Sequence, residues 1–196
     1  MNKLPIALLI ALVGLPQISE TIYTPSLPSV AENLNASASW VEMTLSIYFL
    51  GFALGVLLWG TISDSIGRRL TMLIGLLIYI VSTFLCGSAN SIESLLIWRF
   101  VQAFGISVGS VITQTIIRDI YSGDEKVKLF SIISAALAFS PAIGPLVGGF
   151  ISEQLMWRGN FWFLTLLGTL LFAWTHYQLP ETKPAKTLKN SIDYPL

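Results

Sequence analysis

The sequence predicts an all-α membrane protein with six transmembrane helices. Hydrophobic residues make up 54% of the chain and charged residues only 11%, and the hydrophobic residues fall into six runs of about 20 residues. A soluble domain typically has about a quarter of its residues charged, whereas about 20 apolar residues suffice to cross a bilayer. A soluble protein with a buried helical core would need far more polar surface than this chain supplies.

The six expected spans cover residues 4–23, 40–62, 70–89, 92–112, 129–151 and 161–179. They form one expected bundle, residues 1–182, followed by a polar tail or linker at 183–196. The first run follows Lys3 and so resembles the start of a secretory signal peptide. No small-x-small cleavage site follows, and the run continues through Tyr23. We therefore expect it to be retained as the first span.

The basic residues predict the orientation of the bundle. An even number of spans places both termini on one side, and the opposite side then holds only Arg158. Basic residues are enriched in cytoplasmic loops, so both termini are expected in the cytoplasm. Nine basic residues fall on the cytoplasmic side: Lys3, Arg68, Arg69, Arg118, Lys126, Lys128, Lys183, Lys186 and Lys189.

Composition also excludes several functions. Acidic and basic residues are equal in number, so no basic face predicts a nucleic-acid partner. Cys86 and His176 are each the only residue of their type, which excludes a disulfide framework or a multi-ligand Cys/His metal site. No GxxxxGK[ST] loop is present and no nucleophile–base set is visible. Neither an enzyme nor a cofactor is predicted.

Arg99 is the first candidate functional residue, because it lies about eight residues, or about 12 Å, into the fourth expected span. Polar groups inside a span must face protein or a water-filled cavity. Gln102 lies three residues further along the same helix face and could orient the guanidinium. Arg99 is therefore expected to face a central cavity; the alternative is an arginine that anchors the helix at the headgroups.

Glu20 is the second ionisable candidate, since it closes the first expected span after Pro16, which can kink the helix. A carboxyl group beside a cavity in the membrane can take up and release a proton. The alternative is an interfacial glutamate on the outer rim.

Two stretches combine small residues with charges or prolines. In GTISDSIGRRL, Gly60 and Gly67 permit a tight turn around Asp64, a carboxylate that the dipole disfavours at a helix C-terminus. Asp64 is therefore expected to pair with the following arginines or to cap a neighbouring helix. In SPAIGPLVGGF, glycines four residues apart permit close helix contact, and two prolines are expected to bend the helix. The residues concerned are Pro141, Gly144, Pro145, Gly148 and Gly149.

These motifs carry a resemblance to a known family. GTISDSIGRRL resembles the loop between helices two and three of the major facilitator superfamily, with Gly60, Asp64, Gly67, Arg68 and Arg69 at the motif positions. RFVQAFG is similar to the fourth-helix motif of its proton-coupled drug exporters, and GPLVGG to the antiporter motif of its fifth helix. TIYTPSLP, WRGNF and LPET resemble the bicyclomycin/chloramphenicol-resistance (Bcr/CflA) branch of twelve-helix drug:proton antiporters.

The resemblance implies one half of a major facilitator superfamily fold and roles for individual residues. Arg99 would take part in proton coupling, Asp64 with Arg68 would form a cytoplasmic latch, and the fifth-helix motif would form an interface helix that shifts during transport. Static packing of that helix is the alternative. In relatives the first-helix acid usually stands where Thr21 is here, whereas this chain has Glu20, about 100° around the helix.

The predicted function is the amino-terminal half of a proton-coupled multidrug efflux antiporter. Its expected partners are the lipid bilayer, protons, amphipathic or cationic drugs, and a second six-helix half. The chain ends where a central linker would precede a seventh helix. A truncated transporter is therefore favoured slightly over a functional half that pairs with another chain or a second copy. Side chains that could hold a drug, or simply pack, are Gln17, Tyr23, Tyr48, Gln102 and Gln114.

Two other functions are open at this point. One is a uniporter or nutrient symporter of the same superfamily, which the antiporter-like GPLVGG stretch disfavours. The other is an inactive remnant or an assembly partner that transports nothing.

Overall fold

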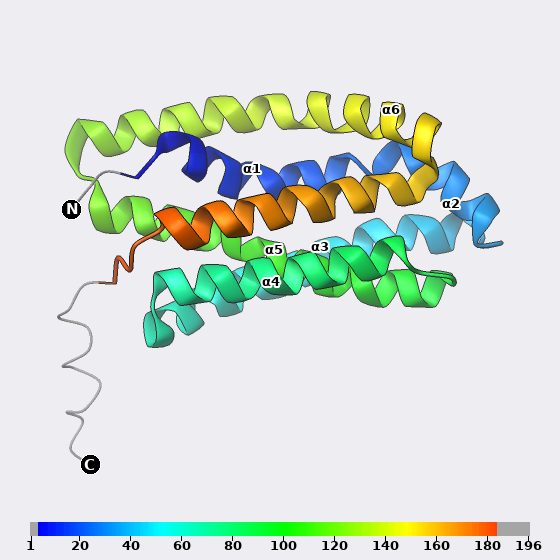
Figure 1. The fold of residues 1–196 in the computed structure, drawn as a ribbon, viewed down its shortest axis with the longest axis horizontal. Coiled ribbons are helices and arrows are strands. Elements are labelled where there is room, and N and C mark those ends of the chain that lie inside the picture. The colour runs from blue at the N-terminus through cyan, green and yellow to red at the C-terminus, as the bar shows by residue number, and fades with distance from the viewer. Residues whose placement is uncertain (1–3, 184–196) are drawn as a thin grey trace, which may run out of the picture.

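The computed structural model describes residues 4–183 as a bundle of long helices (Figure 1). No strand occurs within this range, so the predicted all-α fold is confirmed. The elements are α1 (Ile6–Thr21), the 3-10 turn η1 (Thr24–Ser26), α2 (Leu27–Asn33), α3 (Ala38–Ile66), α4 (Arg68–Gly87), α5 (Ile92–Ile120) and α6 (Gly123–Gln178).

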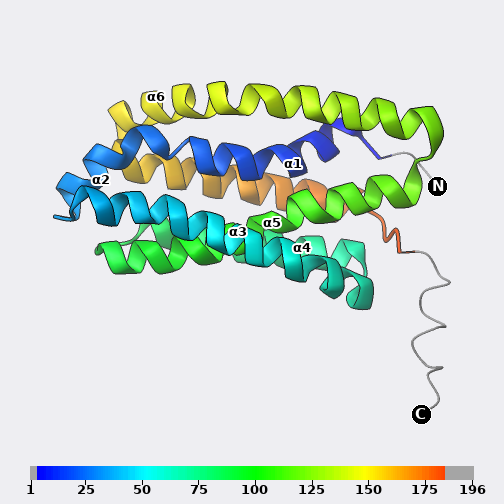
Figure 2. The same ribbon diagram turned by 180° about the vertical axis from the view of Figure 1, so that it is seen from behind.

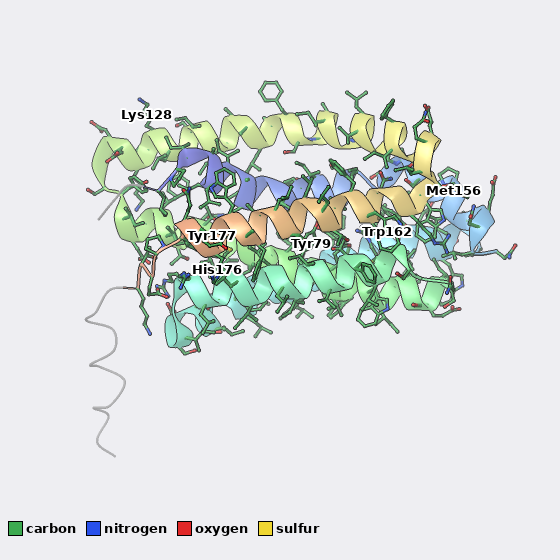
Figure 3. All side chains as sticks on the ribbon, viewed as in Figure 1. Tyr79, Lys128, Met156, Trp162, His176 and Tyr177 are labelled. Atoms are coloured by element: carbon green, nitrogen blue, oxygen red, sulfur yellow. The ribbon has the colours of Figure 1, made fainter. Side chains whose placement is uncertain are left out.

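Helix α6 reverses direction once along its 56 residues. Its backbone dihedrals leave the helical region at Met156, where φ is 60° and ψ is 179°. Two antiparallel limbs result, 123–155 and 157–178, and Met156 lies at the opposite end of the bundle from Lys128 and His176 (Figures 1 and 3). The helix thus contains both the fifth and the sixth expected span. Its backbone stays helical through both prolines of the first limb.

The helices have the length and composition of membrane spans. Five helices between residues 4 and 183 are long and apolar enough to cross a bilayer, counting α1 and α2 together and α6 once. Large apolar side chains face outward on them, such as Leu57 at 70% and Leu146 at 75% exposure, as expected for contact with lipid. The chain is therefore a multi-pass membrane protein. The limits of each span within the bilayer remain predictions.

Helix α5 lies at the centre of the bundle and packs against α1, α3 and α4. Glycines permit these close contacts: a Cβ on Gly55 would overlap α5 at Ser107, and a Cβ on Gly109 would overlap the Leu12 carbonyl of α1. Pro16 has no N–H to bond that carbonyl, which stands four residues before it. The Leu12 carbonyl, which Pro16 leaves without a helical hydrogen bond, therefore occupies the space beside Gly109 where another residue would have its Cβ.

Both described ends of the chain lie at one end of the bundle, together with the α3–α4 and α5–α6 connections (Figure 2). This end carries the described basic residues that were expected on one side: Arg68, Arg69, Arg118, Lys126, Lys128 and Lys183. Arg158 lies at the other end, where it donates to the Ala89 carbonyl. Lys3, Lys186, Lys189 and the tail from residue 184 lie outside the described residues.

Candidate functional site

Arg99 is fully buried on α5 and lies among aromatic rings from three other elements. Its guanidinium carbon is 4.2 Å from the centre of the Tyr48 ring on α3 and 4.6 Å from that of Tyr23, which follows α1. The Phe161 ring, on the second limb of α6, is 6.0 Å away. A cation above an aromatic face gains roughly 0.5–2 kcal/mol, most where water is excluded. The rings therefore partly replace the water that Arg99 lacks.

Hydrogen bonds fix only one end of the guanidinium. Nη1 donates to Gln102 Oε1 at 2.8 Å and reaches the Ser19 carbonyl at 3.5 Å. Gln102 in turn donates to Thr83 Oγ1 at 2.9 Å, so the predicted pairing of Arg99 with Gln102 is present and is held from α4. Nε and Nη2 have no hydrogen-bond partner among residues 4–183. A buried cation with two nitrogens, and so three N–H bonds, left without partners is costly, and an ionisable residue inside a membrane span is a functional-site candidate by default.

A pocket of about 130 Å³ lies beside this cluster, between α1 and α3. Tyr48 links the two, because its ring faces both Arg99 and the pocket while its hydroxyl donates to the Pro16 carbonyl at 3.1 Å. The pocket combines one carboxyl and one amide with three aromatic rings. Its lining residues are Pro16, Gln17, Glu20, Tyr48, Phe49 and Phe52.

The structure therefore brings together most of the predicted cavity residues. Gln17, Glu20 and Tyr48 share the pocket, while Tyr23 and Gln102 contact Arg99. Gln114 does not join them: it is exposed, and 15 residues along α5 place it about 22 Å from Arg99. We refer to Arg99 with Gln102, Tyr23, Tyr48 and Phe161 as the Arg99 site.

A second cluster of charges lies at the α3–α4 connection, which we call the loop network (Asp64, Arg68, Arg69, Asp119 and Glu181). Arg68 Nη1 donates to Asp64 Oδ1 at 2.7 Å, the pairing that the sequence predicted. Its Nε also donates to Asp119 Oδ2, on α5, at 3.2 Å. One arginine thus connects the ends of α3, α4 and α5. Gly60 leaves open space here, since a Cβ on it would meet nothing within 4 Å.

Glu181 binds the start of α4 from the segment that follows α6. Its carboxylate accepts hydrogen bonds from the backbone N–H groups of Arg68 at 2.9 Å and Arg69 at 3.3 Å, and from those of Thr182 and Lys183. Gly67 makes this approach possible, because its φ is +96° and a Cβ there would overlap the carboxylate. A negative charge at a helix N-terminus is favourable.

The sequence analysis missed Asp119 and Glu181. Asp119 stands at the C-terminal end of α5, where the helix dipole disfavours a carboxylate, so the reasoning applied to Asp64 could have found it. Glu181 belongs to LPET, directly after the last apolar run, but nothing local indicates that it returns to residue 68.

Replacement of Glu181 by Gln should reduce the pH dependence of stability. Partial burial of the Glu181 carboxyl raises its pKa, but the four backbone N–H groups lower it more, so the pKa in the folded protein lies below the ordinary value. A lowered pKa stabilises the fold above the unfolded pKa, and this stabilisation disappears as pH falls through the folded pKa. We expect Glu181→Gln to cost up to about 1 kcal/mol at pH 7, because water screens this largely exposed group, and we expect this cost to disappear as the pH falls through the folded pKa.

Thermal unfolding of the purified protein in detergent, followed by circular dichroism at several pH values, checks this expectation. The control is Glu153→Gln, an exposed glutamate at the opposite end of the bundle. Equal losses for the two variants at pH 7 would contradict the assigned contact.

The predicted antiporter helix is the first limb of α6, and it packs against the end of α1. A Cβ on Gly144 would overlap the Thr21 side chain, and one on Gly148 would overlap the Ile22 carbonyl. Gly149 has open space beside it. The close approach of α6 to the chain directly beyond Glu20 thus depends on the absence of side chains at 144 and 148.

Comparisons with known proteins agree with this architecture. Residues 9–194 match the sequence profile of the Major Facilitator Superfamily. A protein from Rickettsia bellii named "Uncharacterized transporter" is 46% identical over 98% of this chain and 48% of its own length. A "Chloramphenicol resistance protein" from Pseudomonas aeruginosa is 36% identical over 86% of this chain and 41% of its own. A "Bicyclomycin resistance protein homolog" from Haemophilus influenzae is 31% identical over 86% of this chain and 42% of its own length.

The chain spans about half the length of these curated relatives. Among solved structures, the proton:xylose symporter XylE has a TM-score of 0.78 at 18% identity, over 90% of this chain and 44% of that one. At this identity the likeness shows the fold alone.

Proposed function

The chain belongs to the Major Facilitator Superfamily, and we propose that it supplies the amino-terminal six-helix half of a proton-coupled multidrug efflux antiporter. Its relatives include drug-resistance proteins of the bicyclomycin and chloramphenicol type. A second six-helix half completes the transporter. Both termini face the cytoplasm of a cell whose inner membrane holds the protein.

The observation that carries this proposal is the Arg99 site with its adjoining pocket. The guanidinium of Arg99, with two nitrogens unbonded, lies over the Tyr48 ring, and Tyr48 and Glu20 line the same pocket. The positive charge of Arg99 favours the deprotonated form of Glu20 while burial opposes it, and a cationic drug beside Glu20 replaces a proton there. Drug and proton therefore compete for one carboxylate, which is the requirement for exchange of one for the other.

The side chains that line the pocket also suit the proposed substrates chemically. Tyr48, Phe49 and Phe52 offer aromatic faces to an amphipathic or cationic drug, Glu20 supplies the negative charge, and Gln17 a hydrogen-bonding amide. Movement between the two facing states would use the contact of Gly144 and Gly148 with α1. The loop network would hold one of these states through Arg68, whose two carboxylate partners lie on different helices.

Efflux measurements test the proposed function. The chain is joined in frame to the second half of one of the drug-resistance relatives and expressed in a strain sensitive to lipophilic cations. We expect energised cells to extrude ethidium, and a protonophore to stop the extrusion. Uptake instead of extrusion would favour a symporter or uniporter. Equal ethidium retention in cells with and without the fused protein would contradict a transport function.

A further inference from the structure

We propose that Asn160 is a positioning residue that holds the aromatic rings on which Arg99 lies. The inference rests on the proposed function only for the role of Arg99 in transport. The position of Arg99 itself can be measured without any transport assay. Asn160 belongs to the WRGNF stretch at the reversal of α6, a motif that the proposed function leaves without a role.

Asn160 joins three segments through one amide group. Its Nδ2 donates to Ser26 Oγ in η1 at 2.7 Å and to Ser152 Oγ in the first limb of α6 at 2.9 Å. The two serine hydroxyls are hydrogen bonded to each other at 2.7 Å. Asn160 and Ser26 are buried, at 0% and 1% exposure. We call these three residues the Asn160 cluster.

The Asn160 cluster lies at the break in α6, where helical hydrogen bonds do not join the two limbs. Met156 leaves the helical conformation with a positive φ, so no continuous helical hydrogen bonding joins the two limbs of α6 there. Ser152 stands four residues before this break and Asn160 four residues after it. Their hydrogen bond therefore fixes the two limbs relative to each other, and Ser26 adds the segment after α1.

Residues close in sequence to the Asn160 cluster carry two of the rings that contact Arg99. Phe161 comes directly after Asn160, and Tyr23 stands three residues before Ser26. The two rings pack against each other with centres 5.5 Å apart, and both lie within 6.0 Å of the Arg99 guanidinium. Tyr23 is held further by Thr44, whose Oγ1 hydroxyl donates to the Tyr23 hydroxyl oxygen at 3.2 Å. The Asn160 cluster thus sets the distance between two segments that each contribute a ring.

The orientation of the Arg99 guanidinium depends on these rings more than it would if all of its nitrogens were hydrogen bonded. Only Nη1 has hydrogen-bond partners among residues 4–183, and they lie at one end of the guanidinium. Contact with Tyr23, Phe161 and Tyr48 therefore decides where Nε and Nη2 point. A shift of Tyr23 against Phe161 would turn these two nitrogens relative to the pocket.

Two other residues of WRGNF, Trp157 and Arg158, also help to hold Phe161 in place. Arg158 donates to the Ala89 carbonyl at 2.8 Å and lies over the Trp157 ring at 4.3 Å. Trp157 packs edge-on against Phe161, with ring centres 5.9 Å apart. The second limb is thereby tied to the α4–α5 connection, while Asn160 ties it to the first span.

Nuclear magnetic resonance of the Nε–H groups in ¹⁵N-arginine-labelled protein tests the inference. The 196-residue chain is placed in lipid nanodiscs, and the Arg99 signal is assigned from its loss in Arg99→Gln. A proton above an aromatic face is shielded by the ring current, so the Arg99 signal should lie upfield of those from the other arginines. Asn160→Leu keeps the size of the side chain and removes both hydrogen bonds, and Ser152→Ala removes one. The control is Asn33→Leu, an exposed asparagine in α2.

We expect the Arg99 signal to move toward those of the other arginines in Asn160→Leu and to move part of the way in Ser152→Ala. Asn33→Leu should leave it in place. Ser152→Ala keeps the test decisive if Asn160→Leu does not fold. An unmoved Arg99 signal in the folded variants would overturn the inference, and so would a common displacement of all arginine signals. Loss of ethidium efflux in the fused protein with the Arg99 signal in place would count against this inference but not against the proposed function.

Discussion

Replacement of Arg99 by glutamine should abolish proton-coupled efflux while the helices stay assembled. Glutamine can still donate toward Gln102, and removing the charge also removes the cost of burying it. The cation–π contacts with Tyr23 and Tyr48 disappear, each worth about 1–2 kcal/mol in a site without water. The attraction toward Glu20 disappears with them. A decrease of at least about tenfold in protonophore-sensitive ethidium efflux is expected.

Arg118→Gln is the matched control, since Arg118 stands on the same helix but is exposed at its end. Arg99→Lys should restore only part of the activity, because an ammonium group lacks the planar surface that stacks between the two tyrosines. If Arg99→Gln and Arg118→Gln extrude ethidium equally well, Arg99 has no part in coupling.

Replacement of Gly148 by alanine should destabilise the bundle strongly, whereas the same change at Gly149 should not. A Cβ at position 148 would overlap the Ile22 carbonyl, and backbone cannot rotate away as a side chain can. Overpacking typically costs about 1–3 kcal/mol, and a backbone contact should lie at the upper end. Gly149 has open space beside it, so alanine there should be neutral or gain up to about 1 kcal/mol of helix propensity.

The two glycine variants are compared by thermal unfolding in the same detergent. The comparison is internally controlled, because the residues are adjacent, share one helix and undergo the same chemical change. Equal stability of the two variants would mean that α1 and α6 do not meet closely at Gly148, and that the first limb is packed differently.

The sequence predicted the fold class and the family correctly because both depend on local patterns. Apolar runs and their small-residue breaks are repeated along the chain, and the family motifs lie within single helices or turns. Arg99 and Gln102 could be paired from sequence for the same reason, since they are one helical turn apart. The choice of Tyr23 and Tyr48 as cavity residues drew on the resemblance, and both are found beside Arg99.

Contacts between distant segments were not accessible in this way. Glu181 approaches Arg68 across 113 positions and Asn160 approaches Ser26 across 134, and no spacing rule connects residues so far apart. The reversal between the fifth and sixth expected spans was predicted, but its place at Met156 was not, because a methionine with positive φ has no local signature. Gln114, an amide in an apolar span, lies on an exposed face of α5 at a different depth from Arg99, so it does not join the Arg99 site.

Proton release on drug addition tests the coupling of Arg99 and Glu20 most directly. Purified protein, joined to a second half, is held in weakly buffered detergent solution with a pH-sensitive dye, and ethidium is added. The parent should release protons as the drug displaces them from the pocket, and neither Arg99→Gln nor Glu20→Gln should do so. Drug binding by the parent without any proton release would contradict the account.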